Sequence, residues 1–144
     1  MISLHEQDFY AWTTQQAALL RAGRLAEADI EHIAEELEDM GKSEKRSLEG
    51  HLTVLLAHLL KWRYQPERRG NSWRLTIIEH RGRIEEAIMD NPSLKPTLSD
   101  TLLRAYRYAR IRAARETGKP LDFFPEHCPF ELSQALDEKF WPES

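Results

Sequence analysis

The sequence predicts an all-α protein, a helical bundle of four to five main helices with one long central helix and an irregular C-terminal strap. Three observations predict this class. Apolar residues recur at helical spacing over most of the chain, no stretch alternates with a period of two, and Gly and Pro residues separate the helical segments. No internal repeat or low-complexity linker divides the 144 residues. We therefore expect a single domain, residues 1–144.

The long central helix is predicted from one apolar stripe. Between Ile30 and Trp62 the apolar residues stay within this stripe at about 100° per residue, with no phase slip across Gly41. Asp29 can cap the start of the helix. We expect one helix from Asp29 to about Tyr64, about 50 Å long at 1.5 Å per residue. A break at Gly41, with a new cap at Ser43, is the alternative.

Capping and stop signals predict the remaining elements. Further helices are expected between Asp8 and Gly23, between Asn71 and Pro92, and between Ser93 and Gly118. Pro96 can be accommodated in the first turn of the last of these. The proline- and phenylalanine-rich tail is expected to form the strap, with one short helix near Leu132–Leu136 and its aromatic side chains against the bundle.

Charge is distributed unevenly along the chain. The net charge is −4, but residues 1–60 carry −6, residues 61–115 carry +7 and residues 116–144 carry −5. A basic middle between two acidic ends can attract an anionic partner. Alternatively, the acidic ends neutralise the middle within the fold or between subunits.

Three features indicate a cytoplasmic location. The single cysteine, Cys128, excludes an intramolecular disulfide. The N-terminal residues MISLHEQDFY lack the basic start and apolar segment of a secretory signal. The longest apolar run, Leu52 to Leu60, is too short to span a bilayer, so we expect no membrane association.

A candidate partner surface follows the most apolar stretch of the chain, where a core helix runs directly into a basic, aromatic loop. Its residues are Lys61, Trp62, Arg63, Tyr64, Arg68, Arg69, Trp73 and Arg74. We expect Arg68 and Arg69 to contact a partner rather than hold the fold, because loop side chains usually face solvent. This surface predicts a protein-interaction (adaptor) module that binds a protein partner or a second copy of the chain.

Nucleic-acid binding is a further alternative. The helix expected after Ser93 carries arginines on its outer faces: Arg104, Arg107, Arg110, Arg112 and Arg115. Arginine and aromatic side chains together can bind phosphates and stack on bases. The same arginines could instead form salt bridges with the acidic 31–39 run.

A buried polar layer is also predicted. If the loop after Tyr64 reverses the chain, His58 lies opposite residues 78–80, and both His58 and His80 face the core. The candidates for this layer are Glu44, His51, His58, His80 and Tyr106. Glu44 falls inside the apolar stripe, so it either pairs with a basic residue or marks a place where the stripe is exposed. We expect the layer to specify which helices pack together.

A histidine-lined pocket between helices would instead favour a hydrolase or a metal-dependent enzyme. Asp29 and His32 have metal-ligand spacing, but no second copy of the pair exists. His51 and His58 lie about 10 Å apart along one helix, too far to share an ion. No nucleotide- or dinucleotide-binding motif is present. We therefore expect no metal and no cofactor, and the sequence names no catalytic residue.

The chain also resembles a known family. The likeness runs from Asp8 to Trp62, continues in QPERRGNSW and includes the closing FPEHCPFELSQAL, so it covers nearly the whole sequence. These residues resemble a bacterial family catalogued only as domain of unknown function twenty-nine. The resemblance implies a small all-helical cytoplasmic protein. That family has no established activity, so the resemblance supplies no catalytic residues.

Overall fold

The computed structural model describes residues 2–143, among which helices are the regular structure and no β-strand occurs. The predicted all-α class is confirmed. Tertiary contacts group the chain into two compact units, unit 1 (Met1–Ser43) and unit 2 (Glu44–Ser144). The single domain expected from the sequence stays a prediction.

The predicted long helix is confirmed. α3 spans Ile30–Tyr64, 35 residues, without a break at Gly41. The Asp29 side chain accepts a hydrogen bond from the backbone N–H of His32, and its carbonyl accepts the first helical bond from Ile33. These contacts satisfy amide groups that a helix N-terminus otherwise leaves unpaired.

Unit 1 places two short helices beside the start of α3. α1 spans Leu4–Gln7 and α2 spans Phe9–Arg21. The Asp8 carboxylate caps α2 by accepting a bond from the Ala11 amide at 3.0 Å, as the sequence predicts. Gly23, with φ of 71°, ends the helical segment in a conformation that glycine adopts without strain. A 3₁₀ turn, η1 (Leu25–Glu27), then leads to α3.

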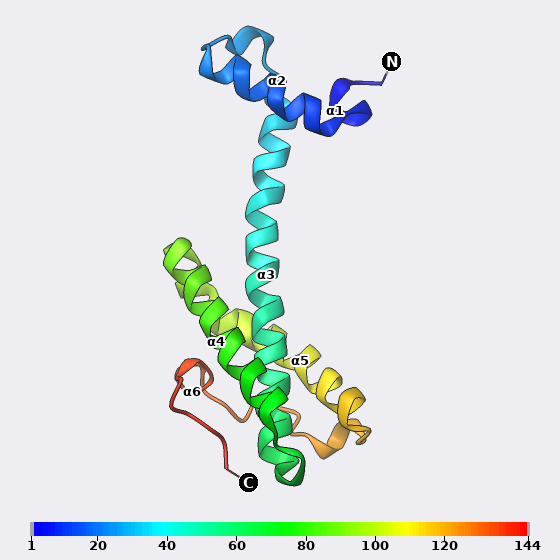
Figure 1. Cartoon of the computed structure of the whole chain (residues 1–144), viewed down its shortest axis with the longest axis vertical. Coiled ribbons are helices and arrows are strands. Elements are labelled where there is room, and N and C mark those ends of the chain that lie inside the picture. The colour runs from blue at the N-terminus through cyan, green and yellow to red at the C-terminus, as the bar shows by residue number, and fades with distance from the viewer. Residues whose placement is uncertain (1, 144) are drawn as a thin grey trace. The chain divides into compact units, whose positions relative to one another are not determined.

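Unit 2 packs two helices against the second half of α3 (Figure 1). After the 3₁₀ turn η2 (Pro66–Arg68), α4 spans Asn71–Asp90. A second 3₁₀ segment, η3 (Pro92–Thr97), precedes α5, which spans Leu98–Thr117. The expected start of this helix near Ser93 is therefore corrected to Leu98. Pro92 and Pro96 lack the backbone N–H that α-helical bonding needs, so the segment adopts the tighter 3₁₀ form.

The core of unit 2 is centred on α3, as its apolar run predicts. The buried α3 side chains begin at Leu48 and continue without interruption from Leu55 to Lys61. α4 contributes Ile77 and Ile84, and α5 contributes a face of small residues, including Ala105 and Ala109, that lets the helices approach closely.

The C-terminal strap, residues 118–143, crosses this core as expected. It contains the 3₁₀ turn η4 (Leu121–Phe123) and the short helix α6 (Leu132–Leu136), whose bounds match the prediction. Phe124 and Phe130 are buried in the core. At its end the Trp141 ring lies 4.8 Å from that of Trp62 on α3. Burial of aromatic side chains therefore holds a segment with little regular structure.

Candidate functional site

The expected partner surface, Lys61 to Arg74, is partly built into the core of unit 2. Lys61 is only 4% exposed, and its ammonium group lies 3.3 Å from the Glu116 carboxylate and 5.2 Å from the centre of the Trp73 ring. Burial lowers the pKa of Lys61, and the nearby Glu116 charge partly offsets this effect. Lys61 therefore connects α3 to α5 and is not displayed to solvent.

Arg69 likewise makes contacts within unit 2. Its Nε donates to the Trp62 carbonyl at 2.6 Å, its Nη2 donates to the Pro142 carbonyl at 3.3 Å, and its guanidinium lies 5.2 Å from the centre of the Trp62 ring. These contacts attach the end of the strap to the end of α3. Arg69 thus helps to hold the fold, contrary to the expectation from its place in a loop.

The other residues of this surface divide between packing and solvent. Tyr64 packs edge-on against Phe124 of the strap, and Arg63 is half-buried. Arg68 and Arg74 are exposed, and Arg68 Nη1 donates to the Thr117 carbonyl at 3.3 Å. A partner role stays a prediction for these exposed arginines.

The structure divides the expected polar layer. His51 lies beside His80, with ring centres 5.3 Å apart. His58 lies instead near Lys61 and Glu116. The register expected between α3 and α4, which set His58 opposite His80, is therefore corrected by two turns of α3. The sequence does not specify how far the loop at residues 65–70 advances α4 along α3.

The remaining members of the layer also separate. Glu44 is exposed, so the apolar stripe is open to solvent at this position, the second of the two alternatives considered for it. Tyr106 is 3% exposed, and its hydroxyl donates to the carbonyl of Pro125 in the strap. Burial raises the pKa of the Tyr106 hydroxyl. The expected single layer is thus a set of separate polar contacts.

Burial makes two of these histidines sensitive to acid. Burial lowers the pKa of His58, and burial together with the neighbouring His80 lowers the pKa of His51. The unfolded chain therefore takes up a proton more readily than the folded chain. The stability that these two neutral histidines contribute is complete above about pH 6.5. It is lost as the pH falls below that value, until the lowered folded pKa is reached.

We expect His58→Leu to reduce the loss of thermal stability between neutral and mildly acidic pH. The imidazole Nδ1 contacts the Val54 carbonyl within the same helix at 2.8 Å, so leucine breaks no hydrogen bond between helices. Melting temperatures measured across this pH range provide the test. His127→Gln, at an exposed position, is the control and should keep the wild-type dependence. If His58→Leu and wild type lose the same thermal stability over this pH range, His58 is not a source of the acid sensitivity.

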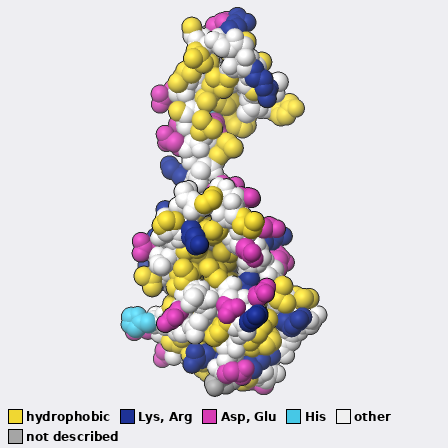
Figure 2. Space-filling view, turned by 90° about the vertical axis from the view of Figure 1, so that its left-hand side faces the viewer, with side chains coloured by type: hydrophobic (Ala, Val, Ile, Leu, Met, Phe, Trp, Pro, Cys, Tyr) yellow, Lys and Arg dark blue, Asp and Glu magenta, His cyan; other side chains and the backbone are white. Residues whose placement is uncertain are grey.

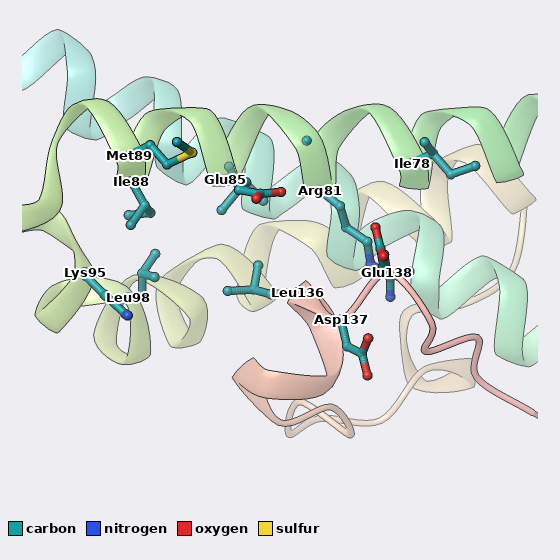
Figure 3. A pocket seen from close by; sticks show the side chains of 12 residues that line it. Ile78, Arg81, Glu85, Ile88, Met89, Lys95, Leu98, Leu136, Asp137 and Glu138 are labelled. Carbon is teal, nitrogen blue, oxygen red and sulfur yellow. The ribbon is translucent and has the colours of Figure 1, made fainter.

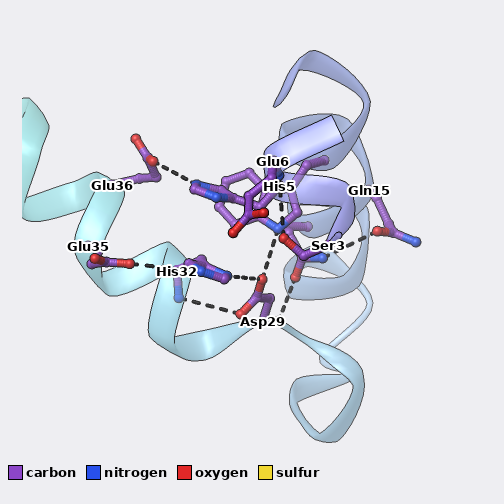
Figure 4. Close-up of polar contacts among 10 residues, drawn as sticks. Ser3, His5, Glu6, Gln15, Asp29, His32, Glu35 and Glu36 are labelled. Carbon is purple, nitrogen blue, oxygen red and sulfur yellow. Dashed lines mark hydrogen bonds and ion pairs between the residues drawn. The ribbon is translucent and has the colours of Figure 1, made fainter. Parts of the chain in front are cut away.

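A second polar cluster, in unit 1, was not predicted (Figure 4). Asp29 accepts hydrogen bonds from Trp12 Nε1 at 3.0 Å and from His32 Nδ1 at 2.7 Å. The His32 ring stacks on the His5 ring at 4.2 Å, and His5 Nε2 lies 2.8 Å from Glu36 Oε1. The bond to Asp29 raises the pKa of His32 and lowers that of Asp29. The three-residue spacing of Asp29 and His32 was the available signal for this contact.

An open groove lies on the side of unit 2 that carries α4 and α6. Figure 2 views this side, where hydrophobic side chains gather between charged ones. The groove has a volume of about 680 Å³, and its apolar lining comes from three elements (Figure 3): Ile78, Ile84, Ile88 and Met89 of α4, Leu98 of α5, and Leu136 of α6. Three carboxylates also line it, Glu85, Asp137 and Glu138, against one lysine, Lys95.

The wide apolar surface of α4 was the sequence signal for this groove. Ile77 and Ile84 face the core, whereas Ile78 and Met89 remain 44% and 73% exposed. A helix that packs against the core on one side needs only one apolar stripe. The apolar residues on a second side of α4 therefore indicate a second apolar surface.

Arg81 closes the groove at the strap. It is 6% exposed, and its Nε donates to the Ala135 carbonyl and its Nη2 to the Phe140 carbonyl, both at 2.8 Å. Its Nη1 is buried and has no hydrogen-bond partner among residues 2–143, and the Trp141 ring centre lies 5.5 Å from the guanidinium carbon. Burial lowers the pKa of Arg81. The neighbouring carbonyls and the aromatic ring stabilise this buried cation.

Two observations bear on hydrolytic and metal chemistry. Within residues 2–143, no group of three or more His, Cys, Asp or Glu side chains is arranged to hold a metal ion. The Cys128 thiol donates to the Phe130 carbonyl, and burial raises its pKa, which disfavours the reactive thiolate. None of the helices described by the structure has both the length and the hydrophobicity to cross a membrane.

Comparison with known proteins identifies the family of the chain. No curated protein and no solved structure matches the chain. The family described as Domain of unknown function DUF29 matches residues 4–141, nearly the whole sequence. The chain therefore belongs to this family, Domain of unknown function DUF29.

Proposed function

We propose that this protein is a cytoplasmic protein-interaction module, and that the groove of unit 2 binds an amphipathic helix with basic side chains along its edges. The observation that carries the proposal is the groove itself. Ile78 and Met89 line it and are exposed to solvent between two helices and the strap. Apolar grooves of this kind accept the apolar face of a partner helix.

The rim of the groove indicates the charge of the partner. Glu85, Asp137 and Glu138 are its carboxylates, and Lys95 is its exposed cation. The guanidinium of Arg81 is already bound by strap carbonyls. A helix with lysine or arginine beside its apolar face would complement this rim, whereas an acidic helix would be repelled.

The groove supports this function better than the enzymatic alternative. An active site usually combines a pocket with converging polar groups. No histidine is among the described residues that line this groove, and its carboxylates lie at an apolar surface open to solvent. The proposal keeps the adaptor role expected from the sequence but moves its main contact surface away from Lys61–Arg74.

Methyl NMR with two model peptides tests the proposal. The peptides would be amphipathic helices of equal length, one with leucine and lysine and one with leucine and glutamate. We expect the lysine peptide to shift the methyl signals of Ile78, Ile88 and Met89, and the glutamate peptide to bind at least about tenfold more weakly. Equal binding of both peptides, or shifts confined to other surfaces, would contradict the proposal.

A matched pair of variants on α4 locates the contact. Met89→Ser should weaken binding of the lysine peptide by about tenfold, because an apolar contact is lost without a change of charge. Leu75→Ser serves as the control, since Leu75 is 50% exposed on the same helix and does not line the groove. Both changes are at exposed positions, so both variants should keep the wild-type melting temperature.

A further inference from the structure

A second surface, in unit 1, combines exposed apolar side chains with negative charge. Ile30, Leu37 and Met40 are 54%, 62% and 65% exposed along one stripe of α3. Glu31 and Glu38 are exposed beside this stripe and form no ion pair among residues 2–143. Hydrophobic side chains are visible over one face of unit 1 in Figure 2. An apolar stripe this open is typical of a surface that binds a protein.

The charge of unit 1 restricts what can cover this stripe. Residues 1–43 contain three Lys or Arg against nine Asp or Glu, a formal charge of −6. A partner must therefore present basic side chains together with apolar ones, because an acidic or uncharged surface would leave these carboxylates without compensation.

The outer face of α5 in unit 2 has this complementary chemistry. Leu103 and Ile111 are 65% and 37% exposed there, and at helical spacing they share the face with Arg104, Arg107 and Arg115. Arg104 pairs with Glu49 at 3.4 Å, whereas Arg107 and Arg115 form no ion pair in the described part of the chain. This face is thus apolar and basic.

Shape and spacing agree with the charges. A hollow of about 390 Å³ beside α5 is lined by Leu103, Arg107 and Ile111 among other residues, and can receive an apolar side chain. Glu31 and Glu38 are seven residues apart, about 10 Å along α3, and Arg107 and Arg115 are eight apart, about 12 Å along α5. Two carboxylates and two guanidinium groups at similar separations can pair at the same time.

We infer that the protein associates with a second copy of itself, and that the α3 stripe of unit 1 in one copy docks on the α5 face of unit 2 in the other. A pair in which both copies make this contact closes into a dimer with two equal interfaces. This contact is separate from the groove, so it does not depend on the proposed function.

Charge reversal tests the inference directly. One variant, Arg107→Glu/Arg115→Glu, makes the α5 face acidic; the other, Glu31→Lys/Glu38→Lys, makes the α3 stripe basic. Each variant alone sets like charges against each other, and we expect its self-association to weaken at least about tenfold. An equimolar mixture restores opposite charges at both interfaces, so it should form a mixed dimer.

Sedimentation and light scattering give the readout. Wild type at high concentration should approach twice the 16.9 kDa mass of the chain, and the dimer should weaken between about 0.1 M and 1 M salt, where the screening length falls from about 10 Å to 3 Å. Arg83→Glu/Lys139→Glu, an equal change of charge at exposed positions of α4 and the strap, is the control and should keep the wild-type mass. Circular dichroism checks that each variant folds.

Three results would overturn the inference. The first is a wild type that stays monomeric at every concentration, which would also be the result if the two surfaces met within one copy. The second is a mixture of the two reversed variants that stays monomeric although each is folded. The third is a monomeric wild type whose α5 arginines bind a single-stranded oligonucleotide, which would assign this face to nucleic acid.

Discussion

Arg81→Ala should lower the free energy of unfolding by about 3–5 kcal/mol, one of the two largest effects expected for this protein. The change removes charge-assisted hydrogen bonds to the Ala135 and Phe140 carbonyls of the strap. Each such bond contributes about 1.5–3 kcal/mol, and its loss leaves a buried carbonyl without a donor. Urea denaturation measures the loss, and limited proteolysis should show faster cleavage within residues 131–143.

A neighbouring arginine provides the control. Arg83 lies two residues further along α4, and its Nε bonds to Glu79 at 3.0 Å with both side chains 55% exposed. Exposed pairs of this kind contribute at most about 0.5 kcal/mol, so Arg83→Ala should have little effect on stability. Arg81→Lys should recover only part of the loss, because lysine keeps the charge but lacks the planar fork. Equal stability of the Arg81 and Arg83 alanine variants would show that Arg81 does not hold the strap.

Glu116→Gln should have the second largest effect, a loss of about 2 kcal/mol. The change removes the negative charge opposite Lys61, which is 4% exposed and cannot regain full hydration without local opening. Removing one partner of a fully buried ion pair costs about 3–5 kcal/mol. The smaller value is expected because the Glu116 side chain is 33% exposed and its charge is partly screened by solvent.

A double-mutant cycle isolates this ion pair. Lys61→Met removes the buried charge and keeps most of the apolar contact. The double variant Lys61→Met/Glu116→Gln should therefore lose less free energy of unfolding than the sum of the losses in the two single variants. The pH supplies a second readout. Burial opposes ionisation of Glu116, but Lys61 and Arg112 outweigh this effect and lower its pKa. The pair's contribution is therefore present above about pH 4.5 and is lost as the pH falls through the lowered pKa. Strictly additive single losses would argue against coupling.

The two units differ in how their charged residues are used. In unit 2, Lys61, Arg69 and Arg81 face the interior, where they bind a carboxylate or backbone carbonyls. In unit 1, Glu31 and Glu38 stay exposed beside an apolar stripe. The basic middle of the sequence is therefore partly structural, and its exposed part includes Arg107 and Arg115 on α5 as well as Arg68, Arg74 and Lys95.

The sequence by itself determined the helices. The α3 stripe, the Asp8 cap and the short helix at Leu132–Leu136 are all where the pattern predicts them. These features depend on hydrogen bonds and side-chain spacing within a few residues, which a single sequence contains. Residues 92–97 form a 3₁₀ segment where the start of an α-helix was predicted. The reason is equally local, because Pro92 and Pro96 lack the backbone N–H that α-helical bonding needs.

Only the tertiary structure decided which polar residues are internal. Lys61 is buried because Glu116, 55 residues later, lies opposite it, and Arg81 is buried because strap carbonyls 54 and 59 residues away accept its hydrogen bonds. The register between α3 and α4 was also decided by the tertiary structure. It differs from the expected register by two turns of α3, so His80 lies beside His51 rather than His58. A charged side chain can leave water only when distant segments supply its partners, and the spacing of residues along one helix does not contain that information.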